Sequence, residues 1–155
     1  MLVKDVMTTS IRSVKPETKL LEVASVMCLY RIPALPVVDD DDKLVGNVSE
    51  IDLLRNLFPS MEDLMSGSGA DQHEKMMPNY GVTMTLKVQD LMASNPVSVT
   101  ADMHVLKAAA KMAGHKFRRI PVTDDSGKLV GVMSLGDVHK AVFQAHLSRA
   151  NCNTD

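Results

Sequence analysis

The sequence predicts a mixed α/β (α+β type) protein built from two similar units, each a small sheet packed with two helices. The first observation is an internal repeat: shifted by 85 positions, Val3–Leu54 aligns with Val88–His139 with 18 of 52 pairs identical and no gap. The second is that helical and strand patterns follow the same order in both copies. The third is the composition, because 155 residues, 45% hydrophobic, with a net charge of −2 are typical of a soluble globular domain.

Each copy opens with a short segment (5–7 and 90–92) and an extended stretch around residues 13–14 and 98–99. Helical spacing follows, with Thr18 as the predicted N-cap of the first helix. The apolar face of that helix is predicted to hold Leu20, Leu21, Val23, Ala24, Met27 and Cys28. The corresponding face in the second copy is predicted to hold Val105, Leu106, Ala109, Met112 and Ala113.

A strand hairpin and a last helix complete each copy. Residues 35–38 and 120–123 are apolar strand patterns, each with a proline near its start. Acidic or Gly-containing turns at 39–42 and 124–127 lead into strands at 43–48 and 128–133. The final helices are predicted at about 50–57 and 135–147.

The predicted organisation is a first repeat over 1–58, a linker over 59–85, a second repeat over 86–150 and a tail over 151–155. The linker contains a Ser-Gly-Ser-Gly run (66–69), Pro78, Gly81 and five methionines. We expect it to be mainly flexible, with one short helical piece near 61–65. A functional segment stays open as the alternative, because composition alone does not separate the two in so long a connection.

The candidate ligand-binding residues lie where a strand ends and a helix begins. Both copies have the pattern Leu-Val-Gly-x-x-Ser-x-x-Asp, which supplies Gly46, Ser49 and Asp52 in the first copy and Gly131, Ser134 and Asp137 in the second. Free N–H groups and the positive end of the dipole make a helix start attractive to phosphate. The serines offer hydroxyls to a phosphate or ribose. A second reading stays open, since Ser-x-x-Asp also forms a capping box that needs no ligand.

The copies differ in the residues before the first hairpin strand. Arg118 and Arg119 align with Pro33 and Ala34. Because arginine suits bidentate phosphate contacts, we expect the second copy to bind phosphorylated ligands more tightly. The alternative is a solvated basic edge.

These motifs resemble the tandem cystathionine-β-synthase (CBS) domain pair, or Bateman module. The resemblance rests on the opening Val-Lys-Asp-Val-Met-Thr (3–8), the Leu-Pro-Val-Val-Asp strand (35–39) with Ile-Pro-Val-Thr-Asp (120–124), and the two Leu-Val-Gly-x-x-Ser-x-x-Asp endings. It implies two pseudo-twofold-related units with clefts that bind adenosine-containing ligands. It also implies that Asp52 and Asp137 accept from ribose hydroxyls, and it adds the strand prolines Pro36 and Pro121 to the candidate ligand-binding set.

The function expected from this resemblance is a regulatory module that binds AMP, ADP, ATP, NAD or S-adenosylmethionine and modulates a separate enzyme or transporter. No cofactor is required. We also expect a homodimer, through a face of the last helix formed by Val138, Ala141, Val142, Ala145 and His146. A ligand-free interaction scaffold is the main alternative, and an unrecognised hydrolase would need catalytic groups that are not visible.

Other classes of function are disfavoured. Charged residues interrupt the first thirty positions, and no run of 18 apolar residues occurs, which argues against secretion and membrane spanning. Two cysteines, Cys28 and Cys152, form no disulfide framework, so a cytoplasmic setting fits best. Near-neutral charge and 3% aromatic residues argue against nucleic acid.

Catalytic and metal sites are not expected either. No standard nucleotide-loop, nucleophile or metalloprotease motif is found. We interpret the acidic run 39–42 as a solvated turn rather than a metal site, His139 and His146 as surface residues, and four repeated methionines as core filling. These methionines are Met7, Met27, Met92 and Met112.

Overall fold

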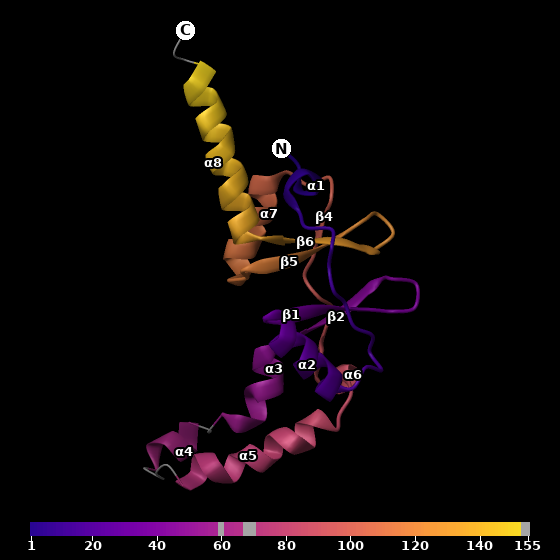
Figure 1. Ribbon diagram of the computed structural model, residues 1–155, viewed down its shortest axis with the longest axis vertical. Helices are drawn as coiled ribbons and strands as arrows, with labels where there is room; N and C mark the ends of the chain where they lie inside the picture. Colours follow the sequence, from indigo (N-terminus) through magenta and orange to yellow (C-terminus); the bar gives the residue numbers. More distant parts are fainter. Residues whose placement is uncertain (59–60, 67–70, 153–155) are drawn as a thin grey trace. The chain divides into compact units, whose positions relative to one another are not determined.

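The computed structural model describes residues 1–58, 61–66 and 71–152, and its mixed α/β architecture confirms the predicted class (Figure 1). In chain order the described elements are α1 (Val3–Val6), α2 (Leu20–Tyr30), β1 (Ala34–Val38), β2 (Leu44–Ser49), α3 (Glu50–Leu54), the 3-10 helix η1 (Arg55–Leu57), α4 (Met61–Met65), α5 (Asp71–Met84), α6 (Val88–Leu91), β3 (Ala93–Ser94), β4 (Val99–Thr100), α7 (Val105–His115), β5 (Arg119–Thr123), β6 (Leu129–Ser134) and α8 (Leu135–Cys152).

The chain forms two compact units that do not simply follow chain order. One, here called the second-repeat unit, combines Met1–Ile11 and Asp41–Leu44 with Val97 onward. The other, the first-repeat unit, combines Arg12–Asp40 with Val45–Pro96. Each unit therefore contains the opening segment of the other repeat.

In the second-repeat unit the strand order is β4-β5-β6. Strand β4 runs parallel to β5, with Val99 beside Val122, and β5 runs antiparallel to β6. Thr8, from the start of the chain, extends this sheet by exchanging two backbone hydrogen bonds with Val132, at 2.9 and 3.0 Å.

The first-repeat unit has the same arrangement, displaced by 85 residues. Its strand order is β1-β2-β3, Val14 lies parallel to Val37, and β3 pairs with β2 so that Ala93 faces Asn47. We call residues 3–8 and 88–94 the lead-in segments of the two repeats, and each of them adds to the sheet of the other repeat. The lead-ins contain helices α1 and α6, and Val3 and Val88 in these helices are completely buried.

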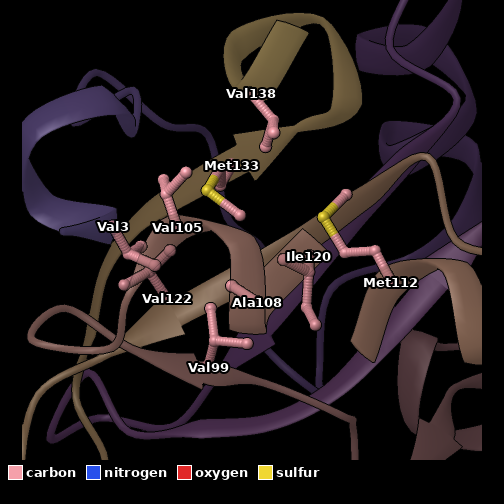
Figure 2. Close-up of a cluster of buried hydrophobic side chains, with 9 residues drawn as sticks. All are labelled: Val3, Val99, Val105, Ala108, Met112, Ile120, Val122, Met133 and Val138. Carbon is pink, nitrogen blue, oxygen red and sulfur yellow. The ribbon is translucent and has the colours of Figure 1, made fainter. Parts of the chain in front are cut away.

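Each unit has its own hydrophobic core. Figure 2 shows the core of the second-repeat unit, formed by Val3, Val99, Val105, Ala108, Met112, Ile120, Val122, Met133 and Val138. The other core is formed by Leu20, Val23, Ala24, Met27, Leu35, Val37, Val48, Leu53 and Val88. Met27 and Met112 lie within these cores and Met92 and Met7 pack against them, which confirms core filling for the four repeated methionines.

The predicted helix faces were too wide. Leu21 and Cys28 are exposed on α2, and Leu106 and Ala113 are exposed on α7, whereas Ala108 is fully buried. The buried residues of α2 are Leu20, Val23, Ala24 and Met27. This i, i+3, i+4, i+7 stripe is the width that one sheet face covers, so neighbouring apolar residues remain outside it.

The predicted N-cap of the first helix was also wrong. Lys19, not Thr18, is the N-cap of α2. The Thr18 hydroxyl instead accepts a hydrogen bond from the Lys15 backbone N–H at 3.1 Å, which stabilises the preceding turn.

The connection between the repeats is more ordered than predicted. The helical piece α4 coincides with the expected residues 61–65, but the 14-residue helix α5 replaces much of the expected flexible linker. Tyr80 and Met84 of α5 pack against the first-repeat core, and this burial offsets the unfavourable Pro78 within the helix. The Ser-Gly-Ser-Gly run lies partly outside the described residues.

The last helices differ in length between the copies. The first is split into α3 and η1, whereas α8 continues to Cys152, five residues beyond the predicted end. Val138 does not belong to a free face of α8, because it is only 7% exposed and lies in the core of its own unit.

Candidate functional site

The carboxyl end of β6 leads directly into α8, and a closed set of hydrogen bonds shapes this junction. The Ser134 N–H and hydroxyl both donate to Asp137 Oδ2, at 2.7 and 2.8 Å. The Asp137 N–H donates in return to Ser134 Oγ at 3.1 Å. The capping-box interpretation of Ser-x-x-Asp is therefore confirmed for the second copy.

The β2–α3 junction repeats this geometry. The Ser49 N–H and hydroxyl donate to Asp52 Oδ2 at 2.8 and 3.0 Å, and the Asp52 N–H lies 3.4 Å from Ser49 Oγ. In both copies the serine hydroxyl is used inside the cap. In both copies the cap does not use the second carboxylate oxygen of the aspartate, Oδ1.

The two Oδ1 atoms have different surroundings. In the first copy Arg55 donates to Asp52 Oδ1 at 3.2 Å. In the second copy, among the residues that the structure describes, no group bonds Asp137 Oδ1. Sequence reasoning missed Arg55, although its position three residues after an aspartate in a helical pattern was a usable signal.

The glycines of the motif lie under the exchanged lead-in segments. A Cβ added to Gly131 would lie 2.6 Å from Met7 Sδ and 3.0 Å from the Thr8 carbonyl oxygen. A Cβ at Gly46 would meet Met92 Sδ and the Ala93 carbonyl oxygen at 2.6 and 3.1 Å. Close packing by itself therefore favours glycine at both positions.

Arg119 lies beside the β6–α8 junction. It is the partner of Ser134 across β5 and β6, and residues directly opposite in an antiparallel pair project from the same face. The carbonyl oxygen of Arg118 accepts the Leu135 N–H at 3.0 Å, which fixes the start of β5 to the start of α8. Both arginines are exposed, and neither guanidinium has a partner within the described part of the chain.

The same face of the sheet carries further residues. Because side chains alternate along a strand, Arg119, Pro121, Val132 and Ser134 share one face, and Thr8 opposite Val132 joins them. We call these five residues the non-core face, since Ile120, Val122 and Met133 point into the core instead. Pro36 is the buried counterpart of Pro121, and its carbonyl oxygen accepts the Val14 N–H at 3.1 Å.

Sequence reasoning also missed two differences between the copies at these junctions. Val132 of the non-core face corresponds to Asn47, and Gly136 in the first turn of α8 corresponds to Ile51. Gly136 leaves the backbone of that turn uncovered by a side chain, whereas Ile51 is 61% exposed. The second copy thus has an apolar side chain at this one position of the sheet face, where the first copy has an amide, and a more open helix start.

Perturbed pKa values lie away from these junctions. The hydrogen bond from Lys4 to Asp102 raises the pKa of the Lys4 ammonium. The Ser126 hydroxyl lowers the pKa of Asp124 in the β5–β6 turn. Over the described residues no cluster of three or more His, Cys, Asp or Glu side chains is arranged to hold a metal ion, and no helix is long and apolar enough to cross a membrane.

Taken together, the exchanged lead-ins and paired strand-to-helix junctions define a duplicated α/β module. The CBS domain family model matches residues 3–59 and again 88–144. The chain belongs to the CBS domain family, as a tandem pair.

Known proteins have similar sequences. A protein of Methanocaldococcus jannaschii is 30% identical over 92% of both chains. The chloroplastic CBS domain-containing protein CBSX1 of Arabidopsis thaliana is 35% identical over 84% of this chain, which spans 58% of the length of that relative.

Solved structures agree with the fold. The crystal structure of CBSX2 from Arabidopsis thaliana has a TM-score of 0.76, with 32% identity and coverage of 94% of this chain and 96% of that one. A crystal structure of CBSX2 in complex with AMP has a TM-score of 0.72 at the same identity and covers 94% and 98% of the two chains.

Proposed function

We propose that the protein is a regulatory module that binds an adenosine-containing nucleotide at the β6–α8 junction and thereby modulates a separate partner protein. One observation carries the proposal: the Arg119 guanidinium and Asp137 Oδ1, both unpaired among the described residues, flank the same helix start. The complex of CBSX2 with AMP makes AMP the first ligand to test.

In this proposal different side chains bind the ribose, the phosphate and the apolar part of the ligand. Asp137 Oδ1 accepts from ribose hydroxyls, and Ser134 acts as a positioning residue that holds the carboxylate through Oδ2. Arg119 and Arg118 bind the phosphate, aided by the uncovered first turn of α8 at Gly136. Pro121 and Val132 supply apolar surface beside the polar groups.

Regulation requires more than occupancy. A ligand changes the activity of a partner only if it binds two conformations or association states with different affinity. We propose a homodimer in a cytoplasmic setting as the regulated assembly, with exposed Val142, Phe143 and Leu147 of α8 as its contact. A monomer mass in light scattering at micromolar concentration would contradict the dimer.

Isothermal titration with AMP and adenosine tests the proposed site. Arg119→Ala should weaken AMP binding about tenfold or more, because a charge-assisted hydrogen bond contributes about 1.5–3 kcal/mol, while adenosine binding stays unchanged. Asp137→Asn should weaken the binding of both ligands. Lys116→Ala, a nearby exposed cation, is the matched control and should change neither.

The alternative is a ligand-free interaction scaffold, which the same exposed side chains of α8 favour. A thermal-shift screen with AMP, ADP, ATP, NAD and S-adenosylmethionine separates the two functions. A ligand at about 100 times its dissociation constant should stabilise the protein by about 2.7 kcal/mol. If none of the five shifts the transition, the scaffold is the better account.

A further inference from the structure

The cation that follows the aspartate by three residues differs between the two copies. Arg55 in the first copy corresponds to Lys140 in the second. Arg55 bonds Asp52 Oδ1 at 3.2 Å, whereas no such bond joins Lys140 to Asp137 within the described residues. The capping bonds to Oδ2 are the same in both copies, so this contact is what distinguishes the two carboxylates.

We propose that Arg55 is a specificity-determining residue that occupies Asp52 Oδ1 and ranks the β2–α3 junction below the β6–α8 junction as a nucleotide site. This inference rests on the proposed function. A ribose hydroxyl that approaches Asp52 competes with the guanidinium for Oδ1, whereas no described residue forms a hydrogen bond with Oδ1 of Asp137.

The exposure of the pair sets the size of the effect. The Asp52 side chain is 13% exposed and that of Arg55 is 68% exposed, so the carboxylate is sheltered and the guanidinium lies largely in solvent. An exposed pair of this kind is weak and easily broken. Arg55 therefore lowers the affinity of the first junction several-fold and does not block it.

The residue type explains why the copies differ. A guanidinium presents a rigid planar fork to a carboxylate, whereas the ammonium of a lysine is a strongly hydrated point charge on a flexible stem. Exchanging the two residue types keeps the charge and changes the geometry. The substitution Arg55→Lys should therefore leave Asp52 open, and Lys140→Arg should cover Asp137.

Charge-conserving exchanges in single-site backgrounds test the proposal, with AMP as the probe. In the Asp137→Asn background, which leaves the first junction, Arg55→Lys should tighten AMP binding about fivefold. In the Asp52→Asn background, Lys140→Arg should weaken AMP binding about fivefold. Lys107→Arg, an exposed exchange on α7, is the control for the substitution itself.

The outcomes separate this inference from the proposed function. If the wild type binds AMP and neither exchange alters affinity, the role of Arg55 is wrong while the function stands. If the wild type binds none of the five ligands of the thermal-shift screen, the proposed function fails instead. NMR relaxation of the Arg55 Nε–H then tests the contact with Asp52 without a ligand. The Arg55 side chain should be restrained in the wild type and more mobile in Asp52→Asn. Equal mobility in the two proteins would overturn the proposal.

Discussion

At the residue scale, the glycine of the Leu-Val-Gly motif is explained by close packing, although its position before a helix start suggests phosphate binding. A glycine before a helix start is expected near phosphate, yet Gly131 lies against the sulfur of Met7 and the carbonyl of Thr8. No spacing in the sequence indicates this, because Met7 is 124 positions away and belongs to the other copy. The contact depends on strand exchange, which is a property of the tertiary structure.

Gly131→Ala should destabilise the protein by about 1–3 kcal/mol, because its Cβ would overlap the methionine sulfur and approach a backbone oxygen. Gly114→Ala is the matched control in the same unit. That position is helical with open space around it, so alanine should stabilise by up to about 1 kcal/mol. Chemical denaturation of both variants checks the prediction, and equal effects would contradict it.

The β5–β6 turn should carry a carboxyl group of lowered pKa. Asp124 accepts from the Ser126 hydroxyl at 2.7 Å and from the backbone N–H groups of Ser126 and Lys128. These bonds favour the ionised form, so they support the turn above the unfolded pKa of aspartate and are lost as the pH falls through the lower folded value. Carbon-detected NMR titration should show this shift, and Ser126→Ala should reduce it.

At the scale of elements, the hairpins and the helices that flank them were predictable from pattern, whereas the helix between the repeats was not. Alternating strands and acidic turns carry local signals, and β1, β2, β5 and β6 begin and end within about a residue of the expected bounds. Residues 71–84 contain Pro78 and Gly81, which argue locally against a helix. Packing against the first-repeat core stabilises α5, and such packing is not encoded locally.

Thr83 should be a key residue for the docking of α5. It is 1% exposed, and its hydroxyl accepts from Asn56 Nδ2 and donates to the Asn79 carbonyl oxygen, both at 3.1 Å. Thr83→Val keeps the shape but removes the bond to the exposed Asn56 amide, which should cost about 0.5–1.5 kcal/mol, the net contribution of one hydrogen bond. Hydrogen exchange should accelerate across Asp71–Met84 more than in α7. The exposed Thr85→Val serves as control, and similar exchange in the two variants would contradict the role of Thr83.

At the scale of the whole molecule, the candidate site was only partly accessible to sequence reasoning. The paired serines and aspartates and the asymmetric Arg119 were visible in one alignment of the chain with itself. The neighbours that distinguish the junctions, Val132 on the sheet and Arg55 on the helix, emerged from strand register and a side-chain contact. Both depend on geometry that a repeat alone does not specify.

Separating the repeats should prevent either half from folding normally. A fragment of residues 1–85 lacks β3 and the buried Val88, and a fragment of 86–155 lacks Thr8 and the buried Val3. Each alone should show reduced secondary structure and no cooperative unfolding, and mixing the two should restore both. Circular dichroism and size-exclusion chromatography check this. Two independently folded monomers would contradict it.

The exchanged lead-ins also bear on how such a chain assembles at low abundance. A polypeptide with a single repeat would complete its sheet by exchanging its first residues with a second molecule. The rate of this bimolecular step would depend on the square of the protein concentration. Placing both repeats in one chain makes the trade unimolecular, at an effective concentration that short tethers raise to about millimolar. Tandem duplication thereby makes the folding of the chain independent of its concentration, in a cell or in a test tube.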